Sequence, residues 1–184
     1  AQAVQIAVTA VSGRMNEAIG QAERLIATAP ADTDAVLLIA SLYAAGQRGE
    51  EAVPLLRQAL DAKPNNLELL DALAMTLIKQ GHMDEAGATL QQIIALEPTV
   101  WNHRLRHAAL YDQQQQYDKA EAVLKEAIRL DPENETHRLA LVEYVAKRRG
   151  LAQAETALLD AHKDLPRSAK VWFAIGSLYE STQR

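Results

Sequence analysis

Proline recurs at a fixed interval of 34 residues along this 184-residue chain, and no other feature of the sequence constrains the fold as strongly. Five of the six prolines keep this spacing: Pro30, Pro64, Pro98, Pro132 and Pro166. Such a period is typical of a solenoid, in which each repeat packs mainly on its neighbours. Because proline lacks an amide hydrogen and clashes with the preceding helical turn, we predict that each of these prolines ends the second helix of a repeat.

Small and apolar residues keep the same period. An alanine stands twelve residues before each proline, and the residue four positions after that alanine is always apolar. Spacings of three and four residues place such side chains on one stripe of a helix. A side chain larger than alanine would force closely packed helices apart, so we predict that the alanines lie at helix contacts. They are Ala18, Ala52, Ala86, Ala120 and Ala154.

Residues able to cap a helix follow most of the periodic prolines. Asp32, Asn66, Asn134 and Ser168 each stand two residues after a proline, and their side chains can accept a hydrogen bond from the first amides of the next helix. Val100 breaks this rule. The sixth proline, Pro54, falls inside a second helix, and we predict that it lies in the first turn, where its missing amide is tolerated.

A further pattern in the first half of each repeat identifies a family. One copy reads Val36, Ile39, Ala40, Tyr43, and the last reads Trp172, Ile175, Gly176, Tyr179. With the alanine and the proline, these residues resemble the tetratricopeptide repeat, whose pattern is Trp-x2-Leu-Gly-x2-Tyr, then Ala-x3-Phe, then Pro. The resemblance covers essentially the whole chain. It implies an all-α fold, an α-solenoid of antiparallel helix pairs wound into a right-handed superhelix.

We therefore expect a single repeat domain over residues 1–184. Its units are predicted at 1–32, 33–66, 67–100, 101–134 and 135–168, with a partial sixth unit at 169–184. The opening helix looks out of register, because its apolar residues Val4, Ala7, Val8 and Val11 come two residues later than the pattern requires. The last unit supplies one strongly apolar helix without a partner, and the chain does not begin with Met. We therefore expect it to be a fragment of a longer chain.

The resemblance also implies a binding surface, since the first helices of such hairpins line a concave groove. The outward positions of those helices are unusually apolar, which favours a peptide or an amphipathic helix of a partner protein as ligand. Alternatively, some of these residues complete the packing between neighbouring first helices. The candidate partner-binding residues are Leu37, Ser41, Asp71, Met75, Lys79, Leu105, Arg106, Asp112, Leu139, Glu143, Lys147, Phe173 and Ser177.

Composition excludes several other classes of protein. The net charge of −5, with acids and bases mixed, argues against binding to nucleic acid, which needs a concentrated basic surface. Two basic clusters, one around His103–His107 and one at residues 147–149, are predicted to be solvated helix faces. The chain has no cysteine, so disulfides and thiol chemistry are excluded. No apolar run approaches the roughly 20 residues that cross a bilayer, so we expect no membrane insertion within this segment.

No enzyme motif appears, and we predict no catalytic residue, no cofactor and no metal site. His103 and His107 lie one helical turn apart, but only arginine and leucine separate them, and a metal needs three or four converging donors. The leading interpretation is a scaffold for protein–protein interaction. The alternatives are a structural element that self-associates through its terminal helices, and an accessory domain of a larger enzyme or secretion-system protein. The alanine-rich composition suggests a bacterial source, and the sequence is compatible with cytoplasm or periplasm.

Overall fold

The computed structural model of the protein describes residues 2–28 and 32–182, which form eleven α-helices and no β-strand. The all-α prediction is confirmed for these residues. The helices are α1 (Gln2–Val11), α2 (Met15–Thr28), α3 (Thr33–Ala45), α4 (Gly49–Ala62), α5 (Leu67–Gln80), α6 (Met83–Leu96), α7 (Trp101–Gln113), α8 (Tyr117–Leu130), α9 (Glu135–Arg149), α10 (Leu151–Asp164) and α11 (Ala169–Ser181).

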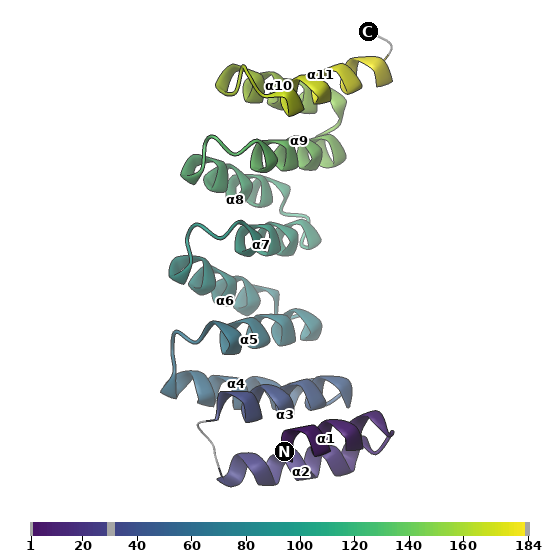
Figure 1. Ribbon diagram of the computed structural model, residues 1–184, viewed down its shortest axis with the longest axis vertical. Helices are drawn as coiled ribbons and strands as arrows, with labels where there is room; N and C mark the ends of the chain where they lie inside the picture. Colours follow the sequence, from purple (N-terminus) through teal and green to yellow (C-terminus); the bar gives the residue numbers. More distant parts are fainter. Residues whose placement is uncertain (1, 29–31, 183–184) are drawn as a thin grey trace. The chain divides into compact units, whose positions relative to one another are not determined.

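The chain divides into two compact units, an N-terminal unit at Ala1–Leu96 and a C-terminal unit at Glu97–Arg184. The N-terminal unit contains the antiparallel hairpins α1–α2, α3–α4 and α5–α6 (Figure 1). The C-terminal unit contains the hairpins α7–α8 and α9–α10, followed by α11 (Figure 1). The prediction of one domain over the whole chain stays a prediction.

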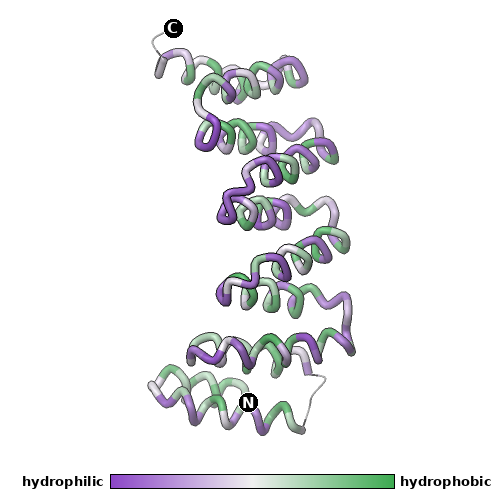
Figure 2. The backbone as a smooth tube through the Cα atoms, turned by 180° about the vertical axis from the view of Figure 1, so that it is seen from behind, coloured by the Kyte–Doolittle hydropathy of each residue, from purple (hydrophilic) through white to green (hydrophobic). Residues whose placement is uncertain are grey.

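The periodic alanines lie at the helix contacts, as predicted. All five are at most 1% exposed, and so is Ala22, which stands in the apolar column four residues later. The leucines of that column, Leu56, Leu90, Leu124 and Leu158, are at most 2% exposed. Figure 2 shows hydrophobic and hydrophilic stretches alternating along the helices, as expected where one face of each helix is packed. The cores therefore consist of the residues that the 34-residue period identifies.

The helix boundaries follow the predicted proline and capping residues. Helices α4, α6, α8 and α10 each end two residues before a periodic proline. Pro30 lies outside the described residues. Each of the predicted capping side chains accepts a hydrogen bond from an amide in the first turn of the next helix, as the oxygen of Asn66 does from the amide of Leu69 at 2.9 Å. Val100 provides no side-chain cap to α7, so the exception seen in the sequence is real.

The prediction for Pro54 was partly wrong. Helix α4 does begin at Gly49, as required, but Pro54 is its sixth residue and therefore lies in the second turn. The first turn of a helix leaves its amides without partners in any case, whereas an amide at this position would have bonded to the carbonyl of Glu50. The helix nevertheless continues to Ala62.

The opening helix is in register with the other repeats, and the prediction that it is out of register was wrong. Its buried residues are Ile6 and Thr9, which stand 34 residues before Ala40 and Tyr43. The valines that suggested a shifted register point outward instead, since Val4, Val8 and Val11 are 68%, 59% and 90% exposed. Helix α1 thus carries apolar residues on both faces, and its outer face is a valine stripe.

Candidate functional site

The predicted partner-binding residues all lie on first helices of the hairpins, namely α3, α5, α7, α9 and α11, and none of them is buried. Their surface position is what a binding role requires, but their binding role itself stays a prediction. The exposed members are Ser41, Met75, Lys79, Leu105, Glu143, Lys147, Phe173 and Ser177, and the half-buried members are Leu37, Asp71, Arg106, Asp112 and Leu139.

The apolar members of this set differ in their surroundings. Phe173 is 78% exposed, Met75 is 46% exposed and Leu105 is 37% exposed. Leu139 instead packs against the buried core cluster that α10 and α11 form in the C-terminal unit. Leu139 therefore belongs in part to the packing between helices, which was the alternative interpretation, whereas Phe173 and Leu105 present their surface to solvent.

Asp112 is held by two residues of the next first helix. The carboxylate of Asp112 on α7 accepts hydrogen bonds from the guanidinium of Arg148 and from the hydroxyl of Tyr144 at 3.2 Å, both on α9. Burial and the bond to Asp112 raise the pKa of Tyr144 to about 12. The guanidinium of Arg148 also lies over the ring of Tyr117 at 5.4 Å. Asp112 thus joins two helices, and a ligand would have to compete with those contacts.

The first basic cluster is not a solvated face, contrary to our prediction. Arg104 and His107 are only 6% and 3% exposed, and they occupy positions that hold apolar residues in most other repeats. The guanidinium of Arg104 donates a hydrogen bond to the carbonyl oxygen of Pro98. A buried charge needs such a partner, because an unpaired one is very costly in a protein interior.

The same bond recurs in the following repeats of the C-terminal unit. In each case the side chain of the residue six positions after the periodic proline donates a hydrogen bond to the carbonyl oxygen of that proline. Arginine in one repeat and tryptophan in the next therefore supply the same hydrogen bond. The bonds are Arg138 Nε to Pro132 O at 3.0 Å and Trp172 Nε1 to Pro166 O at 3.1 Å.

The two histidines of α7 do not converge on a common point. Nε2 of His103 lies 2.7 Å from a carboxylate oxygen of Glu97. His107 packs its ring against Tyr111, with centroids 4.5 Å apart, and burial lowers the pKa of His107. Within residues 2–28 and 32–182, no three His, Asp or Glu side chains come together as a metal site would require.

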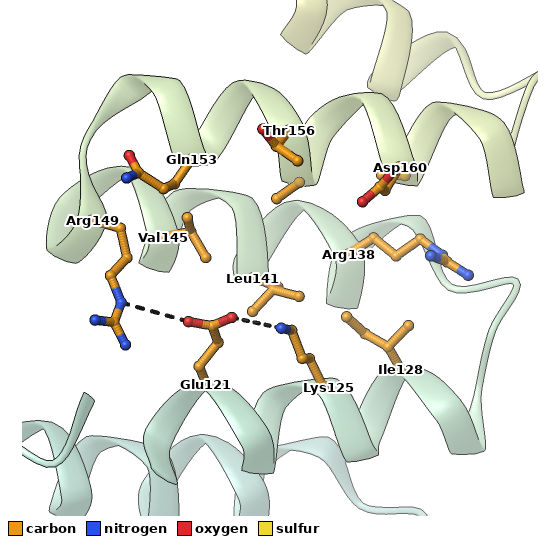
Figure 3. A pocket seen from close by; sticks show the side chains of 12 residues that line it. Glu121, Lys125, Ile128, Arg138, Leu141, Val145, Arg149, Gln153, Thr156 and Asp160 are labelled. Carbon is orange, nitrogen blue, oxygen red and sulfur yellow. Dashed lines mark ion pairs between the residues drawn. The ribbon is translucent and has the colours of Figure 1, made fainter. Parts of the chain in front are cut away.

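A cleft of about 600 Å³ lies in the C-terminal unit between α8 and α10, with α9 as its floor (Figure 3). None of its lining residues was predicted as a site residue. Figure 3 shows α8 and α10 as opposite walls, with Leu141 near the centre of the floor. The lining residues are Glu121, Lys125, Ile128, Arg138, Leu141, Val145, Arg149, Gln153, Thr156, Ala157, Asp160 and Ala161.

Ion pairs surround the apolar floor of this cleft. Glu121 on α8 accepts from Lys125 at 2.6 Å and lies 3.7 Å from the guanidinium of Arg149 (Figure 3). At the other end, Arg138 pairs with Asp164 at 2.6 Å. The two arginines thus fix both ends of the cleft, and its middle combines aliphatic floor residues with charged walls.

Comparison with known families gives three matches along the chain. Models described as tetratricopeptide repeat match residues 11–66, 44–109 and 100–144, so that together they cover residues 11–144. No match was found among curated protein sequences. No helix within residues 2–28 and 32–182 is both long enough and apolar enough to span a membrane.

Solved structures of similar fold are numerous. A tetratricopeptide repeat protein from Parabacteroides merdae is 16% identical with a TM-score of 0.64, over 97% of this chain and 71% of that one. MamA from Desulfovibrio magneticus RS-1 is 16% identical with a TM-score of 0.61, over 89% and 93%. A structure of Naa15/Naa10 bound to HypK-THB is 16% identical with a TM-score of 0.62, over 99% of this chain and 29% of that one. At these identities the likeness shows the fold alone.

Proposed function

The chain belongs to the tetratricopeptide repeat family, and we propose that it holds a peptide or a helix of a partner protein against the outward faces of its first helices. The fold is typical of protein-interaction scaffolds, and one structure of similar fold was solved with a bound protein, HypK-THB. The family and fold are generally non-catalytic, and we propose no catalytic role for this segment.

The observation that carries the proposal is the solvent exposure of large apolar side chains on first helices. In the C-terminal unit these are Phe173 and Trp172 on α11 and Leu105 on α7, and Met75 on α5 has the same character in the N-terminal unit. Burying one large apolar side chain against a ligand is worth about 1.5–3 kcal/mol. A few such contacts would give binding of moderate strength once the entropy of association is subtracted.

A double charge substitution tests the first-helix surface. Peptides would be selected from a displayed random library on the wild-type chain, and their affinity measured by calorimetry for Leu105→Glu with Phe173→Glu. We expect at least about tenfold weaker binding, because each glutamate must be desolvated where an apolar group was buried.

The matched control places the same two charges on second helices. Leu130 on α8 and Leu151 on α10 are also exposed, and Leu130→Glu with Leu151→Glu should leave affinity within about twofold. Circular dichroism must show that both variants keep their helical content. Equal affinity of the two double variants for the selected peptides would refute the proposed surface.

Self-association is a second candidate function, favoured by the valine stripe of α1. Val4, Val8 and Val11 form one exposed aliphatic row on a helix that contains no charged residue. Sedimentation velocity over a concentration series would detect association. A Val8→Glu variant should abolish that association if the stripe is the contact, and a chain that is monomeric at all concentrations would rule this candidate out.

A further inference from the structure

Three residues that line the cleft between α8 and α10 are smaller than their counterparts in the N-terminal unit. Positions two repeat periods apart can be compared directly between the two units. Val145, Ala157 and Ala161 line the cleft, where the N-terminal unit has the larger residues Leu77, Thr89 and Ile93. Leu77 and Ile93 are almost completely buried there. Because protein interiors are otherwise close-packed, the shorter side chains leave unfilled space above α9.

An ion pair crosses the equivalent groove of the N-terminal unit, and the cleft has no counterpart of that pair. There, Arg57 on α4 pairs with Glu85 on α6. The corresponding residues of the C-terminal unit are Lys125 and Gln153, and Lys125 pairs with Glu121 of its own helix instead. The middle of the cleft is therefore not spanned by that ion pair.

The most exposed charges of the two walls have opposite signs, although the α8 wall also carries Glu121, whose side chain is only 20% exposed and pairs with Lys125 and Arg149. On the α8 wall the side chain of Lys125 is 62% exposed, and on the α10 wall that of Asp160 is 61% exposed. Among residues 2–28 and 32–182, each forms its ion pair within its own helix, Lys125 with Glu121 and Asp160 with Lys163 at 2.8 Å. Exposed ion pairs within one helix are weak, so either side chain can leave its intrahelical partner and pair with a ligand group at little cost in free energy.

We propose that this cleft binds an amphipathic α-helix of a partner protein, laid along α9, with bulky apolar side chains directed at Ala157 and Ala161. The helix carries acidic residues on the flank that faces Lys125 and basic residues on the flank that faces Asp160. Arg138 and Arg149 mark the ends of the cleft. They are eleven residues apart on α9, which spans about 16 Å, or three turns of a docked helix.

This inference goes beyond the proposed function, because the cleft is walled by second helices and not by the outward faces of first helices. The small aliphatic lining residues Val145, Ala157 and Ala161 favour a ligand with large apolar side chains. Exposed wall charges of opposite sign favour ligand flanks of opposite sign over flanks of one sign. A second copy of the chain and a small apolar molecule are the competing occupants, and the experiments below separate them.

Three synthetic peptides of about 18 residues, all helical and sharing one leucine stripe, serve as probes. One has glutamate on one flank and lysine on the other, one has glutamate on both flanks, and one has lysine on both. The wild-type chain should bind the mixed peptide about fivefold more tightly than either other peptide, as measured by fluorescence anisotropy. A mixed helix can turn end for end to match the walls, so the single-sign peptides are the proper comparison.

A charge change on one wall should alter this preference in a defined direction. Asp160→Lys makes both walls basic, so the variant should prefer the peptide with two glutamate flanks. Asp61→Lys, an equal charge change on an exposed residue of α4 in the N-terminal unit, should keep the wild-type preference. An unchanged preference in Asp160→Lys, or a shift of the same size in Asp61→Lys, would overturn the proposal.

Filling the cleft tests its apolar lining independently of charge. Ala161→Ile introduces the residue that occupies this position in the N-terminal unit, and it should weaken the mixed peptide at least about tenfold. Ala157→Thr does the same with a smaller increase in volume and serves where the first variant fails to fold. Undiminished binding to both folded variants would refute the cleft as the site.

The remaining outcomes identify other occupants or another surface. Sedimentation equilibrium that shows a wild-type dimer and a monomeric Ala161→Ile variant would assign the cleft to a second copy and end the proposal. Binding of a fatty acid or hydrophobic dye in the cleft, with none of the three peptides binding below about 1 mM, would assign it to a small ligand. Loss of the mixed peptide in Leu105→Glu with Phe173→Glu would move the binding to the first helices, against this proposal but in favour of the proposed function.

Discussion

Replacing His107 by leucine is expected to stabilise the C-terminal unit. His107 is 3% exposed, and its Nε2 is buried without a hydrogen-bond partner among the described residues. A buried polar atom without a partner costs about 1–3 kcal/mol. The equivalent positions one repeat earlier and later hold Leu73 and Leu141, so leucine suits the register of the helix. We therefore expect the free energy of unfolding to rise by about 1–3 kcal/mol.

The gain should be larger in mild acid than at neutral pH. Burial lowers the pKa of His107 below its ordinary value of 6.5, so the unfolded chain takes up a proton at a higher pH than the folded chain does. The free energy of unfolding of the wild type therefore falls as the pH drops below about 6.5, until the folded-state pKa is passed. Burial also lowers the pKa of His137, although the charge of Asp131 opposes it. The leucine variant should thus lose part of the acid sensitivity and keep the remainder.

Tryptophan fluorescence provides a selective assay, because Trp101 and Trp172 are the only tryptophans and both lie in the C-terminal unit. Urea unfolding would be followed at about pH 7.5 and about pH 5, with His82→Leu as the control. His82 is an exposed residue of the N-terminal unit, so its replacement should not move the fluorescence midpoint. The reasoning is refuted if His107→Leu leaves the midpoint unchanged at both pH values, or if variant and wild type lose the same stability in acid.

Three further substitutions test individual contacts. Val100→Asn should add the missing cap of α7 and stabilise the chain by about 1 kcal/mol in chemical unfolding, and no gain would mean that the backbone there cannot present a cap. Trp172→Phe removes the bond to the carbonyl of Pro166 and should cost about 0.5–1.5 kcal/mol in thermal unfolding, whereas unchanged stability would show that water replaces the indole. Burial and the hydrogen bond to Asp112 raise the pKa of Tyr144 to about 12, so Tyr144→Phe should remove one tyrosine that titrates near pH 12 from the alkaline absorbance curve. The stability that the Tyr144–Asp112 bond contributes is lost as the pH rises from about 10 through that value. An unaltered absorbance curve would contradict the contact.

The repeat could be predicted from the sequence because its key positions tolerate few residue types. Alanine is required where two helices touch, and proline cannot continue a helix, so both recur wherever the geometry recurs. Polar residues that begin a helix are recognisable for the same reason, as Asn66 and Ser168 illustrate. Each of these predictions depends on a local contact that is repeated in every hairpin.

Two predictions failed where local periodicity does not determine the answer. Helix α1 has apolar residues on both faces, and counting them selected the face of Val4 and Val8 over the face of Ile6. The repeat period, which places Ile6 in the column of Ala40, was the better guide. In α7, the charge of Arg104 suggested solvent exposure, whereas its burial depends on an acceptor six residues earlier in the chain, which no helical periodicity indicates.

The cleft of the C-terminal unit was not predicted, because it results from differences between repeats and not from their shared pattern. Three of its lining residues, Val145, Ala157 and Ala161, are smaller than their counterparts in the N-terminal unit. Each of these residues is an acceptable core residue by itself, so none of them is conspicuous in the sequence. A comparison of side-chain size along each repeat column would have revealed the hollow.

Arg138 links the backbone requirement of a repeat to the charge pattern of the cleft. In the N-terminal unit, the side-chain nitrogen Nε2 of Gln92 donates a hydrogen bond to the carbonyl oxygen of Pro64 at 3.0 Å. Asp160 stands at the position equivalent to Gln92, and an ionised carboxylate cannot donate a hydrogen bond. The carbonyl of Pro132 is served instead by Arg138, which also closes one end of the cleft. An acidic residue at position 160 is therefore compatible with the repeat because Arg138 donates to the carbonyl of Pro132 in its place. Without Arg138, that carbonyl would lose its protein donor.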